Sequence, residues 1–390
     1  MNSIKRVLLI HTDGNTFNNP TLKCVVDLLL EHQVNVTIRY PQNFALMPKM
    51  QGVLLLPFGK VYAKLKNVIF NKLCWGCISW LSVWFENTFI YDNYDLIIGV
   101  DRQGLIEAGF LNRMTSTPFV YFSFEIMFES ETSARYKFSE RQAAKYAKQW
   151  FVQDELRATH LQKENGLNPA KKTIVPLASS GSAETSTNRL RDRLGVSPEK
   201  KVAIAMGSIS NWSMAYEIIS SVTNWPDDWV LVVHDRYGRT EIELERLGYD
   251  VGEIFSEKIY LSNQSTILVD DMAEILAGVS AGLAFYRPDY CCPYTGKNLE
   301  YLGLASGKIS TFLRYGIPVI MNEIGSYSDL AKEFGFGLVA EEAADIAHLL
   351  PLFIDSSWSN NANRYYKVYL DFENYKHLVW GKLLDVKKTY

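Results

Sequence analysis

Short apolar runs alternate with helix-length segments from one end of the chain to the other. In the first half, with helices such as Pro20–Glu31 between them, the runs predict strands at Arg6–Ile10, Val34–Arg39, Asp95–Val100, Phe119–Phe122 and Trp150–Val152. In the second half they predict strands at Lys201–Met206, Trp229–His234, Lys258–Leu261, Gly282–Tyr286, Pro318–Met321 and Gly337–Val339. Strands that alternate one by one with helices are typical of a parallel sheet. The pattern therefore predicts an α/β protein.

The longest stretch of small polar residues, Pro176–Arg189, has no apolar periodicity and is typical of a linker. It divides the chain into a unit at 1–176 and a unit at 177–362, followed by an aromatic, helical tail at 363–390 that we expect to pack on the outside, back toward the first unit. In parallel α/β units, ligands bind at the carboxyl ends of the strands, and with two units the cleft between them is the expected place.

The composition excludes several classes of protein. With 390 residues, 47% of them hydrophobic and 21% charged, the chain suits two globular domains and excludes disorder, collagen and coiled coil. Its 40 basic and 43 acidic residues nearly cancel, whereas a general nucleic-acid binder has a basic excess. Aromatic residues are abundant at 13%, which suits a core and also suits platforms for sugars.

The start of the chain and its cysteines point to the cytoplasm. The first apolar run, Val7–Ile10, is too short for a signal peptide. Five cysteines are an odd number, which suits reduced thiols. Cys74 and Cys77 have redox spacing without the preceding strand of a thioredoxin site, and the adjacent Cys291 and Cys292 do not complete a four-cysteine zinc site, so we interpret the cysteines as structural.

The segment at 60–90 has two interpretations. Four lysines alternate with apolar residues at its start, and Leu73–Phe85 then runs thirteen residues without a charge. A span of a bilayer needs about 20 residues, so this run is too short. Trp80 and Trp84 share one helical face, which suits a basic, aromatic helix lying in a membrane interface. The commoner explanation of such a pattern is a buried helix in the first unit.

The most informative motif is Ser306-Gly307-Lys308 at the start of a predicted helix. Ser306 is a favourable N-cap, and Gly307 lets a ligand approach the backbone. Lys308 adds a full charge to the partial positive charge of the helix N-terminus, so a phosphate is the expected ligand. Three residues rather than four separate Gly303 from Gly307, and Ile309 stands where Ser or Thr binds magnesium in a Walker motif, so this is not a Walker motif.

The motifs together resemble the GT-B glycosyltransferases of the bacterial polysaccharide type (family 4/1-like). In that family a Ser-Gly-Lys turn opens a helix, and a Gly-x-Pro-Val-Ile segment and a Gly-x-Gly strand follow it. Here the matching segments are Ser306–Lys308, Phe312–Ile320 and Gly335–Gly337. Further matches in the family's order are Phe151–Leu156, Met206–Ser208 as the glycine-rich donor loop, and Asp270–Leu276 before Ala281–Tyr286.

This resemblance implies two Rossmann-like parallel-sheet domains facing across a cleft, the first binding an acceptor and the second a nucleotide sugar. It implies a metal-independent reaction without a cofactor, because basic side chains and helix N-termini neutralise the leaving diphosphate in GT-B enzymes, and no Asp-x-Asp motif follows a strand here. The implied donor ligands are Gly207, Ser208, Asp271, Tyr286, Arg287, Lys297, Ser306, Gly307 and Lys308. Several of them equally suit structural roles, above all Lys297.

The chain departs from the family at one position. The best-known retaining members carry Glu-x7-Glu at this helix, and the second Glu holds the ribose. Eight residues after Glu300 stands Lys308, so the chain resembles the branch with Ser-Gly-Lys instead. The sequence does not choose between retention and inversion.

Acceptor-side carboxylates are expected from the first unit. Asp13 lies in the loop after the first strand, where inverting GT-B enzymes often place a base. Glu125 lies at the carboxyl end of a later strand among aromatic residues, and Asp101 also follows a strand. Asp13 and Glu125 are our catalytic candidates, although each also suits a turn or a structural carboxylate.

We therefore expect a glycosyltransferase of the hexosyl type that moves a sugar from a nucleotide sugar to a glycan. The acceptor is lipid-linked if 60–90 touches a membrane, and the location is the cytoplasm or the inner face of its membrane. One alternative is a nucleotide-sugar epimerase on the same fold. The other is a catalytically silent subunit that binds a glycan or a partner transferase.

Overall fold

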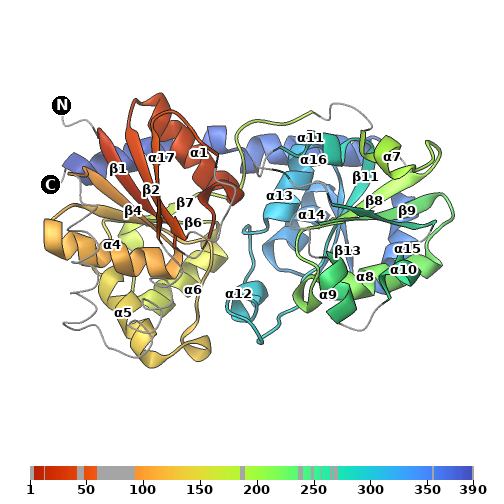
Figure 1. The fold of residues 1–390 in the computed structure, drawn as a ribbon, viewed down its shortest axis with the longest axis horizontal. Coiled ribbons are helices and arrows are strands. Elements are labelled where there is room, and N and C mark those ends of the chain that lie inside the picture. The colour runs from red at the N-terminus through yellow and green to blue at the C-terminus, as the bar shows by residue number, and fades with distance from the viewer. Residues whose placement is uncertain are drawn as a thin grey trace. The chain divides into compact units, whose positions relative to one another are not determined.

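The computed structural model describes residues 4–12, 14–41, 48–58, 93–184, 189–235, 240–246, 250–255, 257–263, 266, 271–353 and 355–388. The chain forms two compact units, Met1–Leu177 with Tyr375–Tyr390, and Ala178–Asn374. Each unit is built on a parallel sheet with helices packed against it (Figure 1). The prediction of two parallel α/β units is confirmed.

The first unit has a described sheet of seven strands in the order β3-β2-β1-β4-β5-β6-β7. The strands are β1 (Arg6–Ile10), β2 (Asn35–Pro41), β3 (Val53–Phe58), β4 (Leu96–Val100), β5 (Phe119–Phe122), β6 (Gln149–Val152) and β7 (Lys172–Ile174). The helices are α1 (Pro20–Glu31), α4 (Asp101–Thr115), α5 (Ala134–Ala144), α6 (Glu155–Asn165) and α17 (Lys376–Lys388). The order reverses at β1 and β4, so the loops after these two strands diverge at the carboxyl edge of the sheet.

Two strands of this unit were not predicted. β3 and β7 lie at the two ends of the described sheet, where each has a single strand partner. β3 is largely half-buried or exposed and contains Pro57, a residue that edge strands tolerate. β7 has only three residues. β3 is apolar along its whole length, so the absence of an apolar run explains only the omission of β7.

Helix α17 comes from the end of the chain but belongs to the first unit. Its Trp380 ring stacks on His32 at the end of α1, with the ring centroids 3.8 Å apart and the planes nearly parallel. Lys387 forms an ion pair with Asp95 at 2.8 Å. Val379 and Leu383 are fully buried, which is the i, i+4 pattern of a helix with one apolar face.

The second unit has a described sheet in the order β10-β9-β8-β11-β12-β13. The strands are β8 (Lys201–Met206), β9 (Trp229–His234), β10 (Ile259–Ser262), β11 (Val279–Ala284), β12 (Val319–Asn322) and β13 (Gly337–Ala340). The helices are α7 (Arg189–Leu194), α8 (Ala215–Ser221), α9 (Thr240–Arg246), α10 (Val251–Ile254), α11 (Ala273–Leu276), α12 (Lys297–Glu300), α13 (Gly307–Arg314), α14 (Ser326–Phe334), α15 (Ile346–Leu349) and α16 (Ser357–Tyr365).

Both faces of the second sheet are buried, which explains why its strands are apolar at nearly every position. Along β8, Val202 and Ile204 pack into a core shared with α11, α13, α14 and α16. The alternate residues Ala203 and Ala205 pack into a second core shared with α8 and α15. This alternation is the period of two expected of a strand.

Helix α13 is seated on the sheet through a glycine. Its buried Ile309, Phe312 and Leu313 face the core at i, i+3 and i+4. The Phe312 ring lies so close to β11 that a Cβ built on Gly282 would come within 2.4 Å of the ring. Only glycine at this position lets the helix approach so closely. The C-terminal residue of the helix, Arg314, donates to the carbonyls of Ser180 and Gly181 at 2.9 and 2.8 Å.

Replacing Gly282 with Ala should destabilise the second unit by about 2 kcal/mol, because the added methyl group displaces a fully buried ring. Urea denaturation measures this loss. The control is Gly381→Ala in α17, where a Cβ meets nothing within 4 Å and helix propensity favours Ala. Equal stability of Gly282→Ala and wild type would contradict the close packing of α13.

Candidate functional site

The carboxyl edge of the second sheet brings together a glycine turn and the start of α13. Gly207 directly follows β8 and has a φ of +102°, a conformation that favours glycine. A Cβ at this position would lie 3.0 Å from Cε of Lys308 and 3.8 Å from its Nζ. The side chain of Lys308 therefore crosses the bare Cα of Gly207, and the two segments that the sequence singled out lie in contact.

The N-terminus of α13 offers hydrogen-bond donors. Ser306 caps the helix, because its Oγ accepts from the N–H of Ile309 at 3.2 Å. The hydroxyls of Ser306 and Tyr286 are hydrogen-bonded at 2.6 Å. The N–H groups of Gly307 and Lys308 belong to the first turn, which has no intrahelical acceptors. In the part of the chain that the structure describes, they have no other acceptor.

The ammonium of Lys308 lies beside two aromatic rings. Nζ lies 5.1 Å from the centroid of Trp212 and 5.0 Å from that of Tyr286, within the range of cation–π contacts. The two rings stack with their centroids 6.1 Å apart. Burial lowers the pKa of Lys308 to about 8. Among the described residues no carboxylate lies within ion-pair distance of Nζ. At pH 7 this group is a cation that has no carboxylate partner in the described part of the chain, and it lies beside two N–H donors.

Two further residues fix this arrangement, and the sequence analysis missed both. Asn322 ends β12, and its side-chain amide accepts from the N–H of Tyr286 at 2.9 Å and donates to the Tyr286 carbonyl at 2.7 Å. Trp212 lies in the turn after Ser208, and its carbonyl accepts from the N–H of Arg287 at 2.8 Å. The position of Trp212, five residues after Gly207, is the sequence signal that could have placed this ring near the glycine turn.

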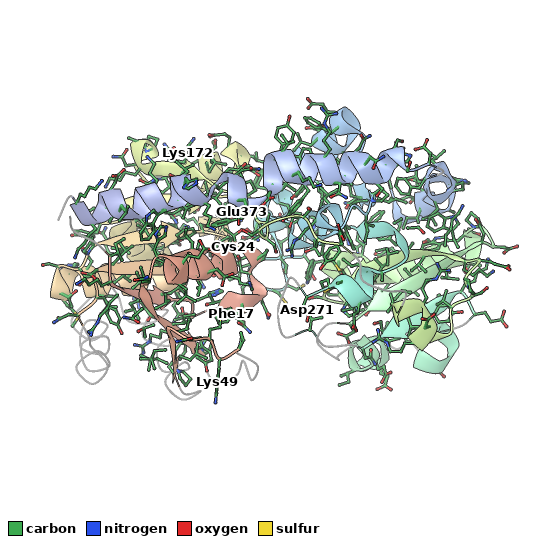
Figure 2. The ribbon with its side chains drawn as sticks, turned by 90° about the horizontal axis from the view of Figure 1, so that it is seen from above. Phe17, Cys24, Lys49, Lys172, Asp271 and Glu373 are labelled. Carbon is green, nitrogen blue, oxygen red and sulfur yellow. The ribbon has the colours of Figure 1, made fainter. Side chains whose placement is uncertain are left out.

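The other predicted donor residues have different surroundings. The guanidinium of Arg287 forms an ion pair with Glu217 at 2.6 Å, so its charge is already compensated. Lys297 begins the short helix α12. Ser208 is half-buried after Gly207, and Asp271 is exposed just before α11 (Figure 2). The structure therefore gathers five predicted residues into one cluster: Gly207, Tyr286, Ser306, Gly307 and Lys308.

In the first unit, Glu125 stands on a turn that buried side chains hold. Asp13 and the segment at 60–90 lie outside the described residues. Gln153 donates to the carbonyl of Ser123 at 2.6 Å, and Arg157 donates to the carbonyl of Phe124 at 2.6 Å. Arg157 is fully buried, and burial lowers its pKa while the charges of Glu125, Asp154 and Asp101 raise it. The half-buried Glu125 is thus the accessible carboxylate of a charged, otherwise buried network.

His11 follows β1 and is neutral. Its ring is buried, and burial lowers its pKa to about 3. Nδ1 lies 3.3 Å from the Thr16 hydroxyl. A Cβ on Gly14 would come within 2.5 Å of Nε2, so the backbone of Gly14 covers the other ring nitrogen. A buried imidazole with such a low pKa does not act as a general base near neutral pH.

Two kinds of feature, a metal-binding cluster and a membrane-spanning helix, are absent from the described residues. These residues contain no group of three or more His, Cys, Asp or Glu side chains that could hold a metal ion. They also contain no helix with both the length and the apolar character needed to cross a membrane.

Known structures share the whole fold. HepE from Anabaena, solved with UDP, has a TM-score of 0.71 at 13% identity, over 98% of this chain and 100% of its own. Sucrose-phosphate synthase from Thermosynechococcus elongatus has a TM-score of 0.71 at 12% identity, covering 99% and 100%. WaaG, a glycosyltransferase involved in lipopolysaccharide biosynthesis, has a TM-score of 0.61 at 14% identity, covering 96% and 99%.

No family model and no curated protein sequence matches the chain. At identities this low, the structural likeness establishes the fold alone. The fold is GT-B, as the resemblance in the sequence implied.

The low pKa of His11 predicts a loss of stability in acid. An unfolded histidine takes up its proton near pH 6.5, whereas the folded one does so near pH 3. The unfolded state therefore binds more protons in this window, and stability falls as the pH falls through it, by about 3 kcal/mol at pH 4. Urea denaturation at pH 7 and pH 4 measures the difference.

The variant His11→Gln should lose correspondingly less stability between pH 7 and pH 4 than the wild type. The control is His348→Gln, which changes an exposed imidazole and should keep the wild-type pH dependence. The same pH dependence in His11→Gln and wild type would contradict the neutral, buried state of His11.

Proposed function

We propose that the protein is a metal-independent glycosyltransferase that transfers a sugar from a nucleotide sugar to a glycan. The observation that carries the proposal is the ammonium of Lys308, which has no carboxylate partner among the described residues and lies beside the N–H groups that open α13, at the carboxyl edge of the second sheet. A diphosphate is the ligand that matches one cation and a helix N-terminus. HepE, which has the same fold, was solved with UDP and with UDP-glucose.

The chemistry of transfer assigns a role to each part of this site. The bond from the sugar to the diphosphate breaks through an oxocarbenium-like state, and negative charge grows on the leaving diphosphate. Lys308 and the N–H groups of Gly307 and Lys308 stabilise that charge where it develops. Because Gly207 has no side chain, Lys308 can pass close over its backbone and present its ammonium to the phosphates. Tyr286 and Asp271 are proposed contacts of the ribose or base, and Ser208, Arg287 and Lys297 line the approach.

The acceptor is proposed to bind to the first unit, where Glu125 orients its hydroxyl and Asp13 is a second candidate. We propose a lipid-linked glycan of a cell-surface polysaccharide or oligosaccharide as the acceptor. This places the enzyme in the cytoplasm, at the inner face of the membrane, with the segment at 60–90 as its membrane contact. The basic and aromatic composition of that segment supports the contact.

The first experiment is a thermal-shift titration with UDP, GDP, CMP and dTDP in the presence of EDTA. We expect one of them to stabilise the protein, by about 2.7 kcal/mol at 100 times its Kd. Lys308→Met should abolish the shift, because it removes the cation and keeps the aliphatic chain. The matched control is Lys332→Met on α14, where an exposed lysine is paired with Glu323.

The other outcomes of this titration are also informative. If none of the four nucleotides binds, the proposal fails and the silent subunit that binds a glycan takes its place. If a nucleotide binds only without EDTA, metal independence is wrong. If its sugar nucleotide is converted to an epimer without any acceptor, the enzyme is an epimerase on this fold.

The pKa of Lys308 predicts how nucleotide binding depends on pH. The free protein holds this proton with a pKa of about 8, and a bound diphosphate favours the charged form. Binding at pH 8 should therefore take up about half a proton. Calorimetry in buffers of different ionisation enthalpy measures the uptake. Above pH 8 the affinity should fall, by up to about tenfold per pH unit.

Lys308→Arg is the control for this pH dependence, because arginine stays charged throughout the range. Any nucleotide binding by this variant should take up no proton at pH 8. Proton uptake equal to that of the wild type would assign the titration to another group.

A further inference from the structure

Asp101 has a backbone conformation that is uncommon for a residue other than glycine. It is the first residue of α4, and its φ of +53° lies in the left-handed region. Residues other than glycine stay in that region where their surroundings impose it, and such residues gather at functional sites. The side chain is also buried, with the residue only 4% exposed. The sequence offers Asp101 as an acceptor-side carboxylate, and its burial favours a role inside the protein instead.

The carboxylate of Asp101 binds the turn that carries Glu125. Its Oδ1 accepts from the N–H of Phe124 at 2.7 Å and from the N–H of Glu125 at 2.9 Å. The carbonyls of Ser123 and Phe124 are bound from the other side by Gln153 and Arg157. Side chains from the start of α4, from the loop after β6 and from α6 thus hold this turn, in place of a neighbouring strand.

Glycines bring α4 close enough for this contact. A Cβ on Gly104 would lie 2.4 Å from the carbonyl oxygen of Ile10, and one on Gly99 would lie 2.6 Å from the carbonyl oxygen of Gly104. The first turns of α4 therefore rest directly on β1 and β4. Oδ2 of Asp101 lies 4.0 Å from Nε2 of His11, but that imidazole is neutral near pH 7 and does not compensate the carboxylate. Arg157 is a nearby positive charge that opposes the charge of Asp101.

We propose that Asp101 is a positioning residue, which fixes the direction of Glu125 toward the acceptor hydroxyl and itself touches no substrate. This inference rests on the proposed function. The two hydrogen bonds to consecutive N–H groups set the backbone at Glu125, and Arg157 holds the same turn from the opposite side. Glu125 is then the single member of this group that an acceptor contacts.

The test is a double-mutant cycle of Asp101→Asn and Glu125→Gln. The rate is the release of nucleoside diphosphate from the sugar nucleotide that the titration selects, with octyl glucoside as the acceptor probe. Glu125→Gln should lower kcat by about 10²-fold or more. Asp101→Asn should lower kcat between about 10- and 10²-fold, because it misplaces Glu125, and should leave nucleotide affinity unchanged. The double variant should lie within about twofold of Glu125→Gln, since one residue acts through the other.

The matched control is Asp95→Asn at the opposite edge of the same sheet. Asp95 also accepts from two consecutive N–H groups, those of Lys5 at 2.8 Å and Arg6 at 3.1 Å. This variant should lower the unfolding temperature and leave kcat within about twofold of wild type. Asparagine keeps one accepting oxygen, so both variants weaken the two backbone hydrogen bonds by removing the charge of the acceptor. The control, which also loses the ion pair with Lys387, separates that cost in stability from an effect on the reaction.

A second variant decides the matter if Asp101→Asn does not fold. Glu125→Asp keeps the hydrogen bonds from this turn to Asp101 and shortens the side chain that carries the carboxylate by one methylene group. We expect an unchanged unfolding temperature and a kcat lowered at least about tenfold. A wild-type rate in this variant would overturn the inference.

Two results separate this inference from the function on which it rests. If the wild type neither binds nor turns over any sugar nucleotide, the proposed function fails and the positioning role falls with it. If the wild type is active, and Asp101→Asn matches it or adds its full effect to Glu125→Gln, only the role of Asp101 is wrong.

Discussion

The contact between Phe312 and Gly282 sets the depth at which α13 lies on the second sheet, and the candidate site depends on that depth. A shallower helix would lift Lys308 away from the bare Cα of Gly207 and the Ser306 hydroxyl away from Tyr286. Packing is cooperative, because close-packed interiors transmit displacements of a few tenths of an ångström. The packing of apolar residues in the core therefore determines where the polar groups of the anion site lie.

The surroundings of Lys308 in the second unit and of Arg157 in the first differ in the negative charge that they provide. In the second unit the ammonium of Lys308 has no carboxylate partner among the described residues, and it lies beside two stacked aromatic rings. Its pKa of about 8 shows the cost of that isolation, and an incoming anion relieves it. In the first unit a fully buried guanidinium is surrounded by carboxylates and is committed to holding a turn. The arrangement around Lys308 suits the binding of an anion, and the arrangement around Arg157 holds the backbone of the turn at Phe124.

The sequence predicted the central strands of both sheets and the edge strands β10 and β13 of the second, but not β3 and β7 at the edges of the first. β7 has only three residues, and the apolar run of β3 contains Pro57, which central strands exclude. It identified Ser306, Gly307 and Lys308, since an N-cap and the next residues are a local signal. It missed the hydrogen bonds of Asn322 and Asp101, because both side chains bind backbone groups far away in sequence. Hydrogen bonds of that range leave no pattern in a single chain. The catalytic candidates Asp13 and Glu125 stay predictions.

The last helix of the chain completes the first unit, and this has a consequence for biosynthesis. The second unit is continuous from Ala178 to Asn374, so all of its residues are synthesised before α17 is made. Until then α1 lacks the Trp380 ring that stacks on His32, and Asp95 lacks Lys387. The unit that is translated first is therefore completed only after the second unit has been synthesised, and until α17 is made a nascent chain leaves the apolar surface under that helix uncovered.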